Sequence, residues 1–162
     1  MVHTTWALKG KTPVITSSGS WKKLTLSGVI VTDPSGTKPR LFLRSIAGNM
    51  NIPETLRLLK ELKCHMRGRK LLLIWDGLPA HRAKVVTAYL NTQKHWLRVV
   101  RFPSYAPEVN PIEYLWGAMK KKYLACCTPE LAAIGRELYR CRSAIRDKNL
   151  LRGFLKASKL YY

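Results

Sequence analysis

The strongest constraint on the fold is a short, uninterrupted apolar segment that ends in a carboxylate. Residues 70–75 place five apolar side chains after one lysine, and Asp76 and Gly77 follow directly. A run of this length predicts a strand, and a strand without polar alternation is typical of the centre of a sheet, buried on both faces. Ligands of open α/β sheets gather at the carboxyl ends of such strands, which makes Asp76 a candidate site residue.

Predicted strands and helices alternate around this segment. Further strands are predicted over residues 21–32, 40–46 and 97–102, and helices over residues 52–66, 80–91 and about 111–125. The first two strands flank a turn with Asp33, Pro34 and Gly36 in favoured positions, so they form a hairpin. An antiparallel pair followed by strand–helix alternation predicts an α/β fold, with a mixed sheet and helices on both faces.

The length of 162 residues suits one domain, which we divide into a main α/β part over residues 1–125 and a basic helical tail over residues 126–162. No apolar run is long enough to span a bilayer, and the start lacks the pattern of a secretion signal, so a cytoplasmic location is expected. The four cysteines form no C-x-x-C pair, which favours reduced thiols over a zinc site.

The charge of the chain points to a polyanionic partner. Lys and Arg total 29 against 9 Asp and Glu, a formal net charge of +20. Lysine and arginine at phosphates release counterions and give strong, sequence-independent binding to nucleic acid. An anionic membrane surface is the alternative, but the basic residues are spread along the chain rather than gathered on one amphipathic helix. Nucleic acid is therefore the predicted partner, and no membrane is expected.

A second acid, Glu113, lies in the first turn of the helix that follows the last predicted strand. Two carboxylates near one strand end could bind Mg²⁺, and a pair of such ions supports phosphodiester cleavage. Each acid also has a structural interpretation. Asp76 can be a simple turn residue after the strand, and Glu113 fits a helix start with Asn110 as N-cap and Pro111 as first helical residue.

Smaller basic and polar features surround the two acids. His81 can contact a substrate phosphate, orient Asp76, or be an ordinary histidine at a helix start. Lys120, Lys121 and Lys122 lie one to two turns beyond Glu113, where they can meet DNA or form a solvated basic face. The candidate DNA-binding residues are His81, Arg82, Asn110, Lys120, Lys121 and Lys122.

Three segments carry a resemblance to a known family. Residues 76–82 (DGLPAHR) resemble the second-aspartate motif of bacterial transposases of the insertion sequence 630 family, in the Tc/mariner superfamily. Residues 105–116 (YAPEVNPIEYLW) resemble that family's third-acid motif, with 36 residues between the two acids, close to the family's spacing. Residues 5–13 (TWALKGKTP) resemble its Thr-Trp segment.

The resemblance implies a ribonuclease H-like fold and a DDE site in which three acids hold two Mg²⁺ or Mn²⁺ ions for DNA transposition. Asp76 would be the second acid and Glu113 the third. The family's first aspartate lies on a central strand before the Thr-Trp segment, and no acid precedes Trp6 here. We therefore expect an amino-terminally truncated catalytic domain that lacks one ligand and the central strand, and that is inactive alone.

The resemblance also implies partners. These are transposon-end and target DNA, a segment from an upstream reading frame that supplies the first strand, and a second copy, because the complete enzyme is expected to be a dimer. The alternative is a non-catalytic, basic nucleic-acid-binding remnant or a partner of full-length transposase. Exposed strand edges on both sides of the gap predict poor solubility or partial unfolding of the isolated chain.

Overall fold

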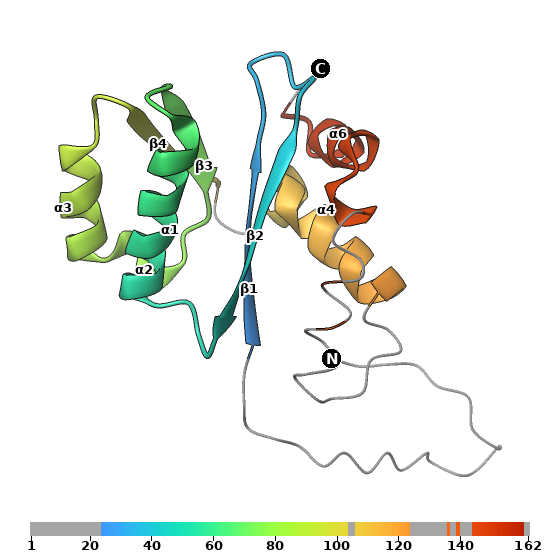
Figure 1. Ribbon diagram of the computed structural model, residues 1–162, viewed down its shortest axis with the longest axis horizontal. Coiled ribbons are helices and arrows are strands. Elements are labelled where there is room, and N and C mark those ends of the chain that lie inside the picture. Colours follow the sequence, from blue (N-terminus) through green and yellow to red (C-terminus); the bar gives the residue numbers. More distant parts are fainter. Residues whose placement is uncertain (1–23, 104–105, 124–135, 137–138, 140–143, 161–162) are drawn as a thin grey trace, which may run out of the picture.

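The computed structural model describes residues 24–103, 106–123, 136, 139 and 144–160. The Thr-Trp segment and much of the predicted basic tail lie outside these ranges, as do Cys126, Cys127 and Cys141. Figure 1 shows a central hairpin, with a second strand pair and its helices on one side and two further helices on the other. In this part of the chain, no helix combines the length and apolarity needed to cross a membrane.

The hairpin predicted around the Asp33 turn is confirmed. Strands β1 (Leu24–Val31) and β2 (Arg40–Ala47) pair antiparallel, with Leu24 opposite Ala47 and Val31 opposite Arg40. The Gly36 amide donates to the Asp33 carbonyl at 2.9 Å, and Gly36 has the positive φ of 70° that glycine tolerates. Hydrogen bonds from Ser35, the Lys38 amide and Thr37 lower the pKa of the Asp33 carboxyl and close the turn.

The second strand pair is parallel. Strand β3 (Leu71–Trp75) lies beside β4 (Leu97–Arg101), with Leu71 opposite Leu97. The single helix predicted over residues 80–91 is wrong, because two helices, α2 (Pro79–Arg82) and α3 (Lys84–Thr92), connect the strands. Ala83 separates them with an extended backbone, φ −58° and ψ 139°. This break lets α2 turn His81 toward the end of β3 while α3 buries Val86 in the core.

Helix α1 (Ile52–Met66) has the predicted bounds and joins the hairpin to the parallel pair. Its buried face of Leu59, Leu62 and Met66 covers β3 and β4. On the hairpin side, the guanidinium of Arg44 on β2 pairs with Glu54 at 2.9 Å and with Glu61 at 3.1 Å.

The N-cap of α1 gives a direct stability prediction. Asn51 Oδ1 accepts the Glu54 amide at 3.0 Å, which satisfies one of the unpaired donors of the first turn. The change Asn51→Ala is expected to lower the free energy of unfolding by about 1 kcal/mol, measured by urea denaturation. Asn51→Asp keeps the acceptor and should keep the stability. Equal midpoints for the alanine variant and the parent chain would contradict this role of the cap.

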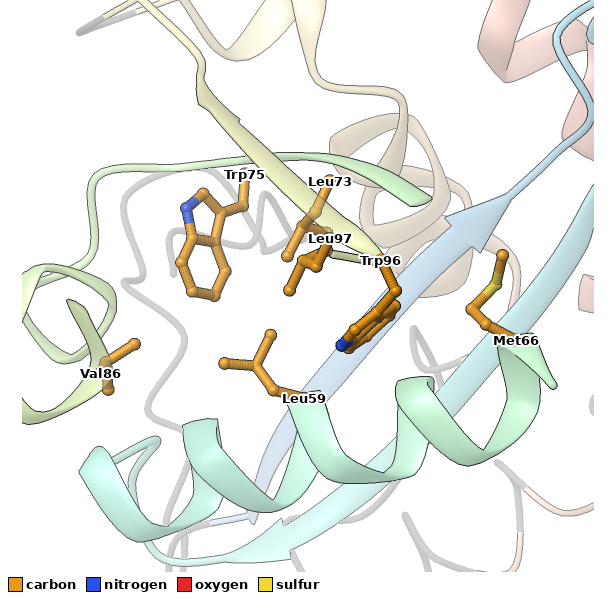
Figure 2. Close-up of a cluster of buried hydrophobic side chains, with 7 residues drawn as sticks. All are labelled: Leu59, Met66, Leu73, Trp75, Val86, Trp96 and Leu97. Atoms are coloured by element: carbon orange, nitrogen blue, oxygen red, sulfur yellow. The ribbon is translucent and has the colours of Figure 1, made fainter. Parts of the chain in front are cut away.

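Two hydrophobic clusters divide the core. The first joins α1, α3 and the parallel strands through Leu59, Met66, Leu73, Trp75, Val86, Trp96 and Leu97 (Figure 2). The second gathers Leu41, Leu115, Met119, Ile145 and Leu151 under the hairpin. Its helices are α4 (Pro111–Ala118), which continues as a π-helical turn η2 (Met119–Tyr123), and α6 (Lys148–Ala157), preceded by the short η3 (Ala144–Arg146).

The second cluster brings the end of the chain onto the hairpin. Helix α6 packs on α4 and β2, so the described part of the predicted tail contributes Leu151 to the same core as Leu115. The division of the chain at residue 125 stays a prediction. Helix α4 lies close against β1, since a Cβ on Gly28 would be 2.9 Å from both Ile112 and Trp116.

The burial of β3 differs from the prediction. Leu73 and Trp75 are buried, but Leu72, on the opposite face, is 58% exposed. Within the described residues the strands form two separate pairs, β1 with β2 and β3 with β4, so β3 has a neighbour on one side only. The mixed α/β architecture with flanking helices is confirmed. The expectation that β3 is covered on both faces is wrong, because no element of the described chain packs over Leu72.

Candidate functional site

Asp76 leaves the carboxyl end of β3 and is half-exposed, with 49% of its side chain accessible. Its Oδ1 accepts two hydrogen bonds, from the Leu78 amide at 3.2 Å and from the Nδ1–H of His81 at 2.7 Å. Oδ2 accepts none from the described residues. Asp76 therefore closes a turn, as its structural interpretation requires, and still keeps one carboxylate oxygen for another partner.

His81 is fixed in its orientation. Its ring stacks on the Trp75 indole with centroids 4.3 Å apart and planes 4° from parallel, and only 11% of its side chain is exposed. The ring Nε2 is buried without a hydrogen-bond partner among the described residues, so the ring forms its hydrogen bond through Nδ1, with the Asp76 carboxylate as acceptor. The hydrogen bond from His81 lowers the pKa of Asp76, against the opposing effect of burial, so Asp76 is a carboxylate at neutral pH.

Glu113 is exposed in the first turn of α4. The predicted helix start is confirmed, because Asn110 Oδ1 accepts the Ile112 amide at 3.3 Å and Pro111 is the first helical residue. A capping box would also use the Glu113 carboxylate to accept the Asn110 amide. That amide instead donates to the Pro107 carbonyl at 3.0 Å, within the short helix η1 (Pro107–Val109). The cap therefore does not need the Glu113 carboxylate.

A cavity of about 540 Å³ connects these elements. Asp76 and His81 line it from the end of β3, and Asn110, Pro111 and Ile112 line it from the start of α4. Glu113 comes next in the chain but is not part of the lining. The structure thus brings Asp76, His81 and Asn110 to one cavity, with Glu113 adjoining it in sequence.

The remaining candidates lie apart from this cavity. Arg82 is exposed on α2 and does not line it. Lys120 and Lys121 are exposed in the π-helical turn after α4, and Lys122 follows them in the same turn. Among the residues that the structure describes, no three His, Cys, Asp or Glu side chains gather as a metal site.

Two aromatic residues support the site in ways that the sequence did not reveal. Trp75 is a buried core residue, and it also forms the surface on which His81 stacks. The Tyr114 hydroxyl donates to the Glu108 carbonyl at 3.0 Å and lies 3.3 Å from the Ala157 carbonyl, so it ties η1 to α6. The only sequence signal is their position, each directly next to an acid, at Asp76 and Glu113.

Comparison with known families gives a match over most of the chain. The model of the family described as DDE superfamily endonuclease matches residues 1–130. The insertion element IS630 uncharacterized 39 kDa protein of Shigella sonnei is 29% identical over 116 residues, which cover 70% of this chain and 32% of that protein. The chain therefore spans about a third of the length of this curated relative.

Solved structures of the Mos1 mariner transposase resemble the fold. Its catalytic domain is 18% identical with a TM-score of 0.60, covering 84% of this chain and 76% of that chain. Its paired end complex with Mn is 19% identical with a TM-score of 0.67, covering 96% of this chain and 47% of that one. At these identities the likeness establishes the fold alone, which is the ribonuclease H-like fold expected from the sequence.

Proposed function

We propose that this chain, which belongs to the DDE superfamily endonucleases, carries two of the acids of a transposase active site, Asp76 and Glu113. Within that superfamily it belongs with the insertion sequence 630 and Tc/mariner transposases. The parent activity is metal-dependent DNA strand cleavage and strand transfer at transposon ends. The observation that carries the proposal is the Asp76 carboxylate, which His81 and Leu78 hold through Oδ1 while Oδ2 stays available.

The donor set suits a hard divalent cation. Asp76 is ionised and half-exposed, and Glu113 is an exposed carboxylate whose helix is capped by other groups. Mg²⁺ and Mn²⁺ prefer such oxygen ligands, and the solved Mos1 paired end complex contains Mn. When bound, a pair of these ions would activate the attacking hydroxyl and stabilise the leaving oxygen. Asp76 and Glu113 would hold them, together with a third acid.

The residues of this chain have distinct tasks in the proposal. Asp76 and Glu113 are the catalytic ligands. His81 is a positioning residue, because its Nδ1–H donates to Asp76 and its ring is buried against Trp75. Arg82, Lys120, Lys121 and Lys122 bind DNA phosphates, and Asn110 holds the start of α4 beside Asp76. With two carboxylates, the chain is expected to need a third acid from a further polypeptide segment before it can cut DNA.

DNA as the partner can be tested through the salt dependence of binding. Lys120 and Lys121 are exposed at the end of the helix that begins beside Glu113. Their joint change to alanine is expected to reduce the slope of log affinity against log salt by about 2, since each phosphate contact contributes about 0.9. The measurement is fluorescence anisotropy with labelled duplex DNA at several salt concentrations.

A matched control removes the same charge elsewhere. Lys60 and Lys94 are exposed lysines on α1 and after α3, and their joint change to alanine should leave the slope nearly unchanged. Equal losses in the two double variants would indicate a diffuse response to the net charge and would count against a binding surface beside Glu113. Such a result would favour the second candidate, a non-catalytic basic nucleic-acid-binding protein, which the net charge of +20 supports equally.

A further inference from the structure

The half of the molecule built on β3 and β4 carries a concentrated group of basic side chains. Residues 62–107 contain nine Lys and Arg and a single acid, Asp76. Four of the nine gather where β3 and β4 begin, and none of the four forms an ion pair with an acid that the structure describes. All four are exposed, and we call them the basic turn surface: Arg67, Arg69, Lys70 and Arg98.

The turn between α1 and β3 holds three of these residues on a defined backbone. Arg67 ends α1 in the left-handed conformation, φ 47°, and Gly68 follows with φ 80°. The Arg69 amide closes this reversal of the chain by donating to the Met66 carbonyl at 2.9 Å. The Arg69 Nε donates to the same carbonyl at 3.2 Å. This contact orients the guanidinium, whose two terminal nitrogens donate to none of the described residues.

Arg98 joins this group from the neighbouring strand. The two strands start side by side, since the Leu71 amide donates to the Trp96 carbonyl at 2.7 Å. Arg98 lies opposite Leu72 in the register. Because side chains alternate along a strand, Lys70 shares the face of Leu72 and therefore the face of Arg98. Two segments of the chain thus place cations on one surface.

The helix dipole explains only part of this group. Basic side chains near the C-terminus of a helix interact favourably with its dipole, and Arg67 and Arg69 lie at the end of α1. Arg98 lies on a strand and gains nothing from this effect. Like charges that gather without a counter-ion repel one another, which favours a bound polyanion.

The basic turn surface is separate from the acid site. Lys70 and Asp76 lie before and after β3, whose five residues at about 3.3 Å each hold the two ends about 16 Å apart. In Figure 1 the turn after α1 lies at the upper end of this half, and α2, which follows Asp76, lies at its lower end. Between the two ends, the apolar side chains of Leu72 and Val100 are 58% and 49% exposed. Phosphates gain nothing from apolar side chains, so contacts at the basic turn surface are independent of contacts at Asp76.

We propose that the basic turn surface binds the phosphate backbone of duplex DNA, as a second contact remote from the acid site. Duplex DNA carries one charge per about 1.7 Å, whereas an extended acidic peptide carries at most one per about 3.3 Å. Cations gathered from one turn and one strand suit the denser polyanion. Arg69 and Arg98 supply guanidinium groups, which can bind two phosphate oxygens each. This contact depends on the proposed function only for the choice of DNA, since neither metal nor the acids take part.

The test measures binding of a labelled short duplex of arbitrary sequence by fluorescence anisotropy. It uses the full 162-residue chain in EDTA, at several salt concentrations. Arg69→Gln combined with Arg98→Gln removes two charges at exposed positions. We expect the slope of log affinity against log salt to fall by about 2, since each phosphate contact contributes about 0.9.

Two controls separate charge at this surface from other effects. Lys38→Gln combined with Lys60→Gln removes two exposed charges from the hairpin and from α1, and should leave the slope nearly unchanged. Arg69→Lys combined with Arg98→Lys keeps both charges and should keep the slope. A loss in the lysine variant would trace the effect to the structure of the turn rather than to its charge, and would overturn the proposal.

A combined variant tests whether the two DNA contacts are separate. Lys120→Ala with Lys121→Ala is expected to lower the slope by about 2. Together with Arg69→Gln and Arg98→Gln, the fall should reach about 4, because distant sites without shared partners contribute additively. If each pair lowers the slope alone but the combination lowers it no further, both pairs contact the same phosphates and there is no second contact.

Other results would also overturn this assignment. Equal slopes for the arginine pair and for the Lys38 and Lys60 control would assign DNA binding to the net charge as a whole. Poly-glutamate that displaces the labelled duplex as well as unlabelled duplex does, at equal charge, would make an acidic polypeptide the partner. Cleavage by the enzyme with all its acids but no change in slope would remove this contact alone. The expected slopes without cleavage in any combination would remove the proposed function alone.

Discussion

Purified alone, the 162-residue chain is expected to leave transposon-end DNA uncut in the presence of Mn²⁺. Combined with a polypeptide segment that supplies a third carboxylate, it is expected to cut. The physical reason is the ligand count, since Asp76 and Glu113 alone would leave a metal pair under-coordinated. A loss of several kcal/mol of transition-state stabilisation corresponds to a rate at least about a thousandfold lower. A nicking assay on supercoiled plasmid that carries a transposon end measures the difference.

The same assay assigns the residues. In the combined enzyme, Asp76→Asn and Glu113→Gln should each reduce cleavage at least about a thousandfold, because each removes a charged ligand. His81→Ala should cost less, about 10–100-fold, because His81 acts through the orientation of Asp76. Glu108→Gln is the matched control, an exposed acid in the adjacent η1 whose loss should leave cleavage unchanged.

Two outcomes would contradict this assignment. Cleavage by the isolated chain that Asp76→Asn abolishes would show that the site is already complete without a further segment. Full cleavage by the combined enzyme with Glu113→Gln would remove Glu113 from the site. A fall in cleavage of equal size in the Glu108→Gln variant would point to a general effect of charge near the start of α4.

Elements with strong local signals could be predicted from the sequence. The hairpin follows from the Asp33 turn, whose carboxylate and Gly36 amide both form the expected hydrogen bonds. The start of α1 follows from Asn51, and the start of α4 from Asn110 and Pro111. In each case the signal and its partner lie within a few residues of one another, so no tertiary contact is needed to determine the structure.

Features that depend on tertiary contacts could not be predicted. The break at Ala83 separates α2, whose His81 stacks on Trp75, from α3, which packs Val86 in the core, and both contacts are made to residues outside the helices. The exposure of Leu72 depends on which element lies beside β3, and an apolar sequence does not specify its neighbour. A local sequence pattern shows which side chains of a segment are apolar. The packing of distant segments determines which of those side chains are buried.

The candidate site shows the same division. The two acids stand out in the sequence because each follows a strand, but their structural and functional interpretations were balanced there. Three contacts favour the functional interpretation. Asp76 accepts the hydrogen bonds of its turn through Oδ1 alone, and the Asn110 amide donates to the Pro107 carbonyl rather than to Glu113. The Trp75 indole stacks on the His81 ring and fixes its orientation. Whether Asp76 and Glu113 bind metal together stays a prediction, which the nicking assay decides.

The second large effect concerns the core that supports Asp76. Leu59 is fully buried on α1, in the cluster that holds Leu73 and Trp75 (Figure 2). Leu59→Ala is expected to lower the free energy of unfolding by about 3 kcal/mol, because the transfer and cavity terms add at a site that cannot collapse. Leu72→Ala removes the same atoms from an exposed position and should cost much less. Urea denaturation of both variants measures the difference, and equal shifts of their midpoints would show that the Leu59 cluster does not carry the stability of this half.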